Sequence, residues 1–400
     1  MIPRQATIPW LIAGFIFILL AAIFMASHTG TNFFAHSVLD SYSLQAIAWR
    51  NGRTSLDQDY PWLELAIYKG DYYVSFPPVP TLPMLLMTFF FGAETPNAFA
   101  SLLYFLSAYL VAFFLLRRMM CPMYAAVISA FALLGGSVLD LAVSGFGMAG
   151  AVWYQAQLLA LLLTLSAFLC MERDNRNSRS ASLILIALAI GCRPFNALYV
   201  PWLLYRLYQK TGADKPLNRL RAMIPHVVIP ALIAALYGAY NFARFGNPLE
   251  FGHSYLPEFV ESGEPMFGIA YIAQNIRQVM TLPTLQAGSL TFPIIAGFAF
   301  YLTNPLLVFG AGRFVKRVLC GQTEPADIAL AVSLLIHCIL LSSHRTNGGW
   351  QYGTRYLVDT LPVALYLYAN KRIRPSAPEM LSMGALIVFN VYGSIVFHYL

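Results

Sequence analysis

Charged side chains are scarce in this sequence of 400 residues, since Asp, Glu, Lys and Arg together make up only 11% of it. Hydrophobic residues account for 58%, and the mean hydropathy is +0.62. Apolar runs of about 20 residues, the length that crosses a bilayer, recur along the whole chain. This composition argues against a soluble globular protein and predicts an all-α, polytopic transmembrane helical bundle.

The sequence also lacks the motifs that bind nucleotides or catalytic zinc. It contains no P-loop, no glycine-rich dinucleotide fingerprint, no HExxH and no paired CxxC. The five cysteines lie in or beside apolar runs without metal-ligand spacing, which is typical of small apolar side chains rather than of disulfides or a zinc site. Nucleotide-driven pumping within this chain is excluded, no cofactor is expected, and a divalent metal is left open but not indicated.

The formal net charge of +7 does not indicate nucleic-acid binding, because the basic residues are placed as in a membrane protein. Of the 25 lysine and arginine residues, 16 fall in five clusters between apolar runs. The positive-inside rule assigns such clusters to the cytoplasm. The clusters are Arg117 and Arg118; Arg173, Arg176 and Arg179; Arg206, Lys210, Lys215, Arg219 and Arg221; Arg313, Lys316 and Arg317; and Lys371, Arg372 and Arg374. Segments 28–77, 242–291 and 344–356 are then expected on the opposite, extracytoplasmic side.

We expect one integral membrane domain over residues 1–400 with about 10 to 12 membrane segments. The first, 8–27, has only Arg4 as a basic flank and is interpreted as a span with the amino terminus inside, not as a signal peptide. Further spans are expected at 97–116, 123–142, 151–171, 224–241, 292–312, 326–343, 356–370 and 379–399.

Two apolar regions do not fit a simple crossing. Residues 78–92 begin with "FPPVPTLP", and a full crossing there would place every later basic cluster outside unless the amino terminus is outside. We favour a segment that dips into the membrane and returns. Residues 181–208 carry Arg193 and Pro194 at their middle, which predicts two half-helices that meet at "CRPFN".

Each long extracytoplasmic segment contains a predicted helix that does not cross the membrane. In the first extracytoplasmic loop, 28–77, "LDSYSLQAIAWRNGR" predicts a juxtamembrane helix with Asp40 at its N-cap and Gly52 just past its end. In the second segment, 242–291, the apolar spacing of "FGIAYIAQNIRQVM" predicts a helix in the membrane interface.

Asp40 is the first candidate for chemistry, because a carboxylate close to the bilayer can accept a proton from an incoming hydroxyl. The alternative is that it only caps a helix. Asp59 and Glu64 follow in the same loop, where solvated acids are common. The segment "YKGDYYVSFPPVPTLP" adds Lys69 and Tyr73, whose roles the sequence leaves open.

Arg193 is the second candidate. An arginine at mid-membrane depth costs about 2.5 to 3.5 kcal/mol on insertion scales, so a binding partner is expected. Its planar guanidinium suits a phosphate or a carboxylate. Either a lipid-linked phosphate or an internal ion pair, for example with Asp140, would provide this partner.

Two loops supply further cationic and aromatic candidates. His253 follows two glycines and a proline in "NFARFGNPLEFGHSY", where a structural role is equally consistent with the pattern. The stretch "HRTNGGWQYGTRY" contributes His344, Arg345, Trp350, Tyr352 and Arg355. Asp359 stands four residues after Arg355, a helical spacing at which the two charges would neutralise each other. Trp350 also fits an ordinary interfacial aromatic.

The order of these motifs resembles the GT-C glycosyltransferase superfamily, which includes protein O-mannosyltransferases and aminoarabinose transferases. The likeness rests on "LDSYSLQAIAWRNGRTSLD", "YKGDYYVSFPPVPTLP", "RPFN", "YNFARFGNPLEFGHSY" and "GGWQYGTRYLVDTLP", and covers most of the chain in order and topology. One position departs from the pattern, since the second acidic place after the first span holds Ser41. A second carboxylate or metal role there is therefore in doubt.

The resemblance implies transfer of a sugar from a polyprenyl-phosphate carrier to an acceptor hydroxyl outside the cytoplasm, with inversion. Asp40 would be the base and Arg193 a ligand of the donor phosphate, joined by His344, Arg345 and Arg355. Contacts to the sugar or acceptor are expected from Asp59, Glu64, Lys69, Tyr73, His253, Trp350 and Tyr352.

The implied partners are the lipid-linked donor, a lipid, glycan or protein acceptor, and membrane lipid, with a bacterial inner membrane as the location. The alternative is a transporter or flippase of a lipid-linked or amphipathic solute. Transporters commonly have paired broken helices. The sequence indicates only the break at Arg193, which favours the enzyme.

Overall fold

The computed structural model describes residues 7–145, 147–212, 215–286, 288–369 and 374–399. Arg4, Lys371 and Arg372, which entered the charge argument, lie outside the described residues. The chain divides into two compact units, with the boundary passing through α4 between Ser101 and Leu102. Each unit is described by itself.

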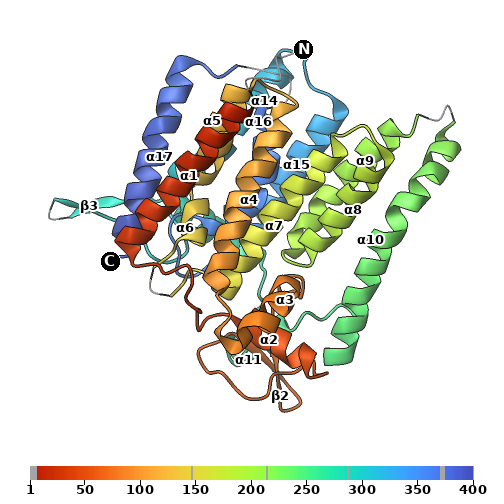
Figure 1. Ribbon diagram of the computed structural model, residues 1–400, viewed down its shortest axis with the longest axis vertical. Helices are drawn as coiled ribbons and strands as arrows, with labels where there is room; N and C mark the ends of the chain where they lie inside the picture. The colour runs from red at the N-terminus through yellow and green to blue at the C-terminus, as the bar shows by residue number, and fades with distance from the viewer. Residues whose placement is uncertain (1–6, 146, 213–214, 287, 370–373, 400) are drawn as a thin grey trace. The chain divides into compact units, whose positions relative to one another are not determined.

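The first unit contains residues 7–31, 102–145 and the described residues from Phe267 onward. Within it α1 packs on α5, and α14 packs on α16 (Figure 1). Its elements are α1 (Thr7–Thr29), most of α4 (Asn97–Arg117), α5 (Pro122–Leu134), α6 (Val138–Ala142), α12 (Ile269–Met280), β3 (Thr284–Gln286), β4 (Ser289–Thr291), α13 (Phe300–Thr303), α14 (Pro305–Leu319), α15 (Pro325–Ser342), η5 (Arg355–Thr360), α16 (Leu361–Ala369) and α17 (Ala377–Phe397).

The second unit contains residues 32–101 and the described residues of 147–266. Here α7 packs on α8, α8 packs on α10, and α2 lies beside α3 (Figure 1). Its elements are α2 (Ser41–Arg50), β1 (Leu65–Tyr68), β2 (Asp71–Val74), α3 (Thr81–Phe91), η2 (Gly92–Glu94), the start of α4, α7 (Val152–Met171), α8 (Arg176–Ile190), η3 (Pro194–Tyr199), α9 (Val200–Lys210), α10 (Pro216–Phe245), η4 (His253–Tyr255) and α11 (Pro257–Ser262).

The predicted all-α, polytopic membrane architecture is confirmed. Among the described residues, six helices are long and apolar enough to cross a membrane, namely α1, α4, α7, α10, α15 and α17. The strands form two short antiparallel hairpins, β1–β2 and β3–β4. Neither hairpin was predicted from the sequence.

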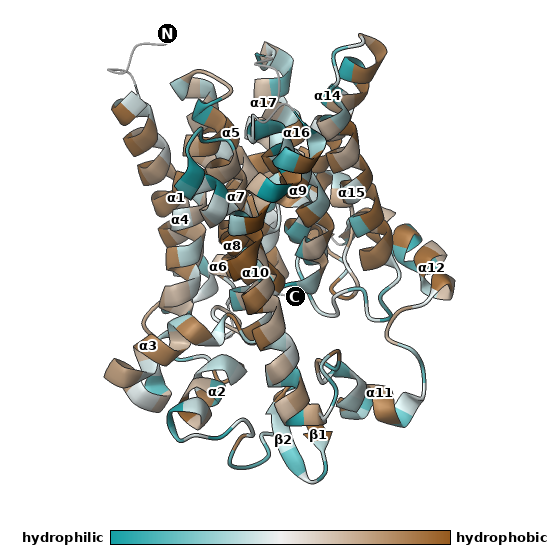
Figure 2. Ribbon diagram, turned by 90° about the vertical axis from the view of Figure 1, so that its right-hand side faces the viewer, coloured by the Kyte–Doolittle hydropathy of each residue, from teal (hydrophilic) through white to brown (hydrophobic). Residues whose placement is uncertain are grey.

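The two regions that did not fit a simple crossing are short helices. α3 has 11 residues, a length of about 16 Å, which is too short to span about 30 Å of hydrocarbon. It is largely apolar, whereas the neighbouring α2 is mixed (Figure 2). As predicted, the second region breaks at Arg193, which separates α8 from η3 and α9. Gly191 lets the backbone beside the break pack closely against Val79 and Tyr237, because a Cβ there would lie 2.4 Å from Val79 Cγ2 and 2.2 Å from Tyr237 Oη.

Three expected spans are interrupted. The span expected at 292–312 begins with non-helical residues, and its main helix, α14, starts only at Pro305. Ala296, Gly297 and Ala299 have φ of 62°, 82° and 31°, values that a right-handed helix does not allow. The span 123–142 is split into α5 and α6, and 356–370 begins with η5 before α16.

The basic clusters were expected between the apolar runs, and this was wrong for several members, which lie within helices. Arg313 and Arg317 lie within α14 and are only 8% and 1% exposed. Arg313 pairs with Glu379 at 2.8 Å, and Arg317 pairs with Asp327 at 3.1 Å. Burial is tolerated because each guanidinium has a carboxylate and also donates to a backbone carbonyl.

Candidate functional site

Asp40 is the N-cap of α2, as the sequence predicted. Its backbone is extended, and its Oδ1 accepts a hydrogen bond of 2.9 Å from the amide of Tyr42. Its Oδ2 accepts a bond of 2.5 Å from the Ser43 hydroxyl, and the side chain of Gln155 on α7 is a further partner. Asp40 is only 1% exposed. The carboxyl group is therefore buried and fixed in orientation.

Burial dominates the proton affinity of this carboxyl group. Desolvation raises the pKa of Asp40 above its ordinary value, while the hydrogen bonds from Ser43 and Gln155 and the charge of His36 oppose the rise. A carboxylate with a raised pKa is a stronger base than a solvated one. The same surroundings that fix Asp40 thus also suit it to accept a proton.

Arg193 lies at the break between α8 and η3. Its backbone is extended, and its amide donates to Ala189 O at 2.9 Å. The side chain is partly buried. Its charge acts on two residues of the same unit, Tyr42 in α2 and His253 in η4. The first loop, the α8 break and the segment after α10 therefore meet around one cation.

His253 is held against the first loop. It follows Gly252, whose φ is 99°, and its ring stacks edge-on against Phe76 at 5.6 Å between centroids. Burial, followed by the charge of Arg193, lowers the pKa of His253 to about 4, although Glu250 and a hydrogen bond with the Ser75 backbone oppose this. At neutral pH the imidazole is uncharged. It can then offer a hydrogen bond to a ligand but no positive charge.

The β1–β2 hairpin positions the other first-loop candidates. Lys69 occupies the turn with a φ of 54°, and its Nζ lies 5.1 Å from the centroid of the Tyr68 ring. Tyr73 is 8% exposed and packs on Phe245, while its hydroxyl donates to Asp71 at 3.4 Å. Both side chains thus lie on the hairpin, with Tyr73 mainly a core residue.

The two remaining acidic candidates of the first loop are exposed. Glu64 accepts a hydrogen bond of 3.1 Å from Trp153 Nε1, and Asp59 lies in the irregular segment before the hairpin. Their predicted contacts to a sugar or acceptor stay predictions.

The cationic and aromatic stretch 344–356 belongs to the other unit. His344 packs edge-on against Phe267 at 5.1 Å between centroids, and two short bridges, Phe267 with His344 and Ile295 with Trp350, hold its start and its middle. Arg355 is buried, and its guanidinium donates twice to Gly348 O, at 3.2 and 2.8 Å. Arg345 is partly buried. The guanidinium of Arg355 thus holds the backbone of this stretch at Gly348.

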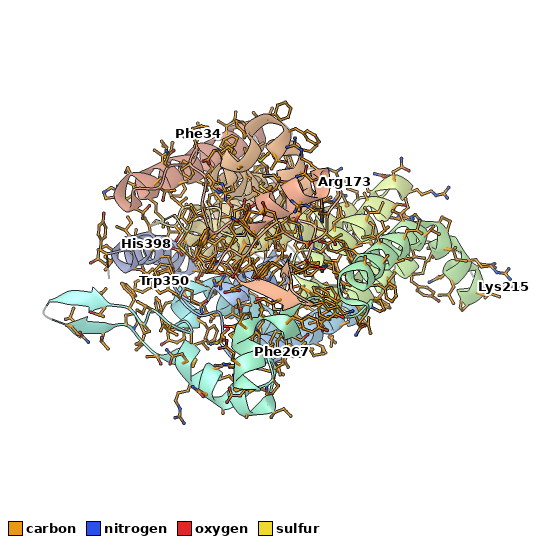
Figure 3. All side chains as sticks on the ribbon, turned by 90° about the horizontal axis from the view of Figure 1, so that it is seen from below. Phe34, Arg173, Lys215, Phe267, Trp350 and His398 are labelled. Carbon is orange, nitrogen blue, oxygen red and sulfur yellow. The ribbon has the colours of Figure 1, made fainter. Side chains whose placement is uncertain are left out.

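The two aromatic candidates of this stretch differ in exposure. Tyr352 is 1% exposed, packs among Phe292, Phe298 and Phe397, and donates to Asn390 at 3.3 Å. Its position in the core argues against the predicted sugar contact. Trp350 is 37% exposed, packs on Phe397 and lies near His398, as Figure 3 shows. Trp350 therefore remains a candidate for stacking on a sugar.

Asp40, Arg193 and His253 belong to one unit, in which the charge of Arg193 acts both on Tyr42, two residues after Asp40, and on His253. His344, Arg345, Trp350 and Arg355 form a second group in the other unit, and a shared site with Asp40 stays a prediction. Sequence reasoning missed Tyr42, Ser43 and Gln155. Ser43 could have been found from the sequence, because it lies in the first turn of the helix that Asp40 caps. Gln155 is far along the chain, and no local pattern points to it.

The alternative partner considered for Arg193 is engaged in its own cluster. Asp140 Oδ1 accepts hydrogen bonds from Ser394 Oγ at 2.5 Å and from His398 Nε2 at 3.0 Å. In the part of the chain that the structure describes, no group of three or more His, Cys, Asp or Glu side chains could hold a metal ion.

No family model and no curated protein matches the chain. Solved structures do resemble it. One is ArnT from Cupriavidus metallidurans bound to undecaprenyl phosphate, with a TM-score of 0.52, 14% identity, and coverage of 94% of this chain and 63% of ArnT. Another is the archaeal oligosaccharyltransferase AglB from Archaeoglobus fulgidus in complex with an inhibitory peptide and a dolichol-phosphate, with a TM-score of 0.52, 13% identity, and coverage of 97% and 55%.

The chain therefore spans about three fifths of these two proteins. Identities this low establish the fold alone. The chain is accordingly an integral membrane protein that shares the helical fold of ArnT and AglB, as the order of its motifs predicted.

Proposed function

We propose that this chain transfers a sugar from a polyprenyl-phosphate carrier to an acceptor hydroxyl at the extracytoplasmic face of the membrane. The observation that carries the proposal is that one unit places a buried carboxylate, Asp40, and a cation, Arg193, near enough to Tyr42 for both to act on its phenol. Both structural neighbours are bound to polyprenyl-type phosphates, which supports a donor of this class.

The reaction needs one base and one site for the leaving phosphate. Asp40 accepts the proton of the acceptor hydroxyl, and the hydroxyl oxygen attacks the anomeric carbon of the sugar. The bond between that carbon and the phosphate oxygen breaks, and its electron pair stays on the phosphate. The configuration at the anomeric carbon is inverted. The guanidinium of Arg193 stabilises the charge that develops on the leaving phosphate.

An apolar groove between α8, α9 and α10 suits part of a polyprenyl chain. Its volume is about 300 Å³, and its lining includes Ile186, Ile190, Leu204 and Tyr237. Ile190 ends α8, so the groove extends along the helix that leads to Arg193. A phosphate at Arg193 with its chain in this groove would keep the lipid tail within the hydrocarbon.

Other roles remain part of the same proposal. His253, uncharged at neutral pH, would donate a hydrogen bond to the donor, and Lys69, Asp59 and Glu64 would contact sugar or acceptor. His344, Arg345 and Arg355 are proposed to face the phosphate, and Trp350 the sugar. The acceptor is a lipid, glycan or protein, and the membrane is proposed to be a bacterial inner membrane.

The transporter alternative calls for a direct test, because the sequence argument against it has weakened. Among the described residues, α5–α6 and η5–α16 are interrupted as well as α8–α9, so the break at Arg193 does not stand alone. A flippase would move the lipid-linked solute without forming a covalent product.

Transfer can be measured with labelled polyprenyl-phosphate sugars and the chain in proteoliposomes. We expect a labelled product from the wild type and at least 100-fold less from Arg193→Gln, since the developing phosphate charge loses its cation. Arg193→Lys, which keeps the charge but loses the planar fork, should fall between them. Exposed Arg53→Gln is the matched control. Movement of the labelled lipid without any covalent product would contradict the proposal and favour the transporter.

A further inference from the structure

Three buried polar atoms near Asp40 have no hydrogen-bond partner among the described residues. They are Ser41 Oγ and Tyr42 Oη at the start of α2, and Gln155 Oε1 at the start of α7. Tyr42 and Gln155 are 0% exposed and Ser41 is 1% exposed. Native proteins rarely leave buried polar atoms unpaired, so a cluster of them points to a missing ligand.

The surrounding polar side chains of α2 are paired, which makes this cluster local. Ser43 donates to Asp40, and Gln45 donates to the Tyr240 hydroxyl at 2.9 Å and accepts from Thr81. Of the unpaired atoms of α2, Ser41 Oγ and Tyr42 Oη lie in the turn that carries the proposed base, whereas the indole Nε1 of Trp49 lies two turns further along the helix.

Tyr42 is placed to serve a ligand at Arg193. Three titratable groups act on its phenol, namely the thiol of Cys192, the guanidinium of Arg193 and the carboxyl group of Asp40. Burial raises the pKa of Tyr42 well above its ordinary value, so the hydroxyl keeps its proton. A protonated phenol beside a cation can donate a hydrogen bond to an anion that the cation attracts.

We propose that the Tyr42 hydroxyl donates a hydrogen bond to a phosphate oxygen of the polyprenyl-phosphate donor, next to Arg193. This inference rests on the proposed function and adds a binding residue to it. Tyr42 would also fix where the phosphate sits relative to Asp40, because both residues belong to the first turn of α2. The donor's reacting carbon would then be held close to the base.

Tyr42→Phe tests the proposal because it removes only the hydroxyl. Without ligand, the melting temperature of the full chain should stay the same or rise, since a buried atom without a partner is lost. Undecaprenyl phosphate should stabilise the wild type more than undecaprenol or inorganic phosphate does. The affinity of Tyr42→Phe for undecaprenyl phosphate should be about 10- to 100-fold lower, as expected for a hydrogen bond to a charged group.

Tyr240→Phe is the matched control, because the Tyr240 hydroxyl has a protein partner. This variant should lower the melting temperature but should not selectively weaken the binding of undecaprenyl phosphate. The inference is overturned if Tyr42→Phe binds undecaprenyl phosphate like the wild type, or if it melts at a lower temperature, which would give the hydroxyl a structural role. If the wild type itself does not distinguish undecaprenyl phosphate from undecaprenol, the proposed function fails and this inference with it.

Discussion

The carboxyl group of Asp40 caps a helix and is also proposed to accept a proton. Oδ1 receives the amide of Tyr42, which is the capping bond, and Oδ2 receives the Ser43 hydroxyl. A hydroxyl can rotate, whereas a backbone amide cannot. Oδ2 is therefore the oxygen that can accept the proton of an acceptor while Oδ1 keeps the cap.

Asp40→Asn should separate the two roles. Asparagine caps helices about as well as aspartate, so the fold should be kept. Because the substitution removes a buried charge, the melting temperature should stay the same or rise. Transfer should fall by about 100- to 10,000-fold, the usual contribution of a general base. Asp40→Ala should lose about 0.5–2 kcal/mol of stability as well, because the cap is gone.

These effects can be measured as transfer rates and melting temperatures of the purified chain. Glu258→Gln on α11, an exposed position, is the control for loss of a carboxylate. Near wild-type transfer by Asp40→Asn would remove Asp40 from the role of base and leave it as a cap.

His253 should make folding stability depend on pH. Its pKa is lowered to about 4 in the folded chain, against about 6.5 in an unfolded one. Between these values the unfolded state binds more protons, so this contribution is fully present above about pH 6.5 and is lost as the pH falls toward 4. The melting temperature of the wild type should then fall more steeply between pH 7 and pH 4 than that of His253→Gln.

The comparison between the two proteins cancels the titration of the acids that they share, including Asp40. We expect the difference in melting temperature to reach several degrees at about pH 4. Parallel curves for the two proteins would show that His253 is not held uncharged by its surroundings.

At the scale of elements, the sequence predicted features that depend on neighbouring residues. The cap at Asp40 and the break at Arg193 are local features of the sequence. The cap follows from a polar side chain before an apolar run, and the break follows from the proline directly after Arg193. The contact of Gln155 with Asp40 joins distant segments and leaves no pattern in either. Hydropathy also failed for 292–312, because it does not register the positive φ angles that end a helix there.

Arg313 and Arg317 show a second limit of sequence reasoning. Charge counting treats every lysine and arginine as solvated, yet these two are buried on α14 and paired. The guanidinium of Arg313 also lies over the ring of Tyr368 on α16, 3.9 Å from its centroid. The cluster therefore joins α14 to α15, α16 and α17 within its unit, in addition to any effect on topology.

Asp327→Asn should destabilise the chain markedly. The pair of Arg317 and Asp327 is 1% and 4% exposed, so the substitution leaves a buried guanidinium without its counter-charge. Breaking a buried pair from one side costs about 3–5 kcal/mol. The pair of Lys210 and Asp174, in which the Asp174 side chain is 84% exposed, is the matched control, and Asp174→Asn should cost about 0–1 kcal/mol. Equal melting temperatures of the two variants would contradict this account.

At the scale of the whole molecule, the long apolar helices differ in burial. In the most apolar window of α7, 78% of residues are buried, against 6% in α10 and 17% in α1. Similar hydropathy thus serves two purposes, since α7 builds a core while α10 and α1 leave apolar faces for lipid. Composition predicts that such helices enter the membrane but does not tell which of them the protein surrounds.

The sidedness of the chain is a prediction that the native cysteines can test. Cys320 is exposed after α14 and is expected in the cytoplasm, whereas Gln58 is exposed in the first loop and is expected outside. In intact cells, a membrane-impermeant maleimide should label Gln58→Cys, with Cys320 replaced, and should label Cys320 of the wild type only after permeabilisation. The opposite pattern would place Asp40 in the cytoplasm and exclude transfer at the extracytoplasmic face.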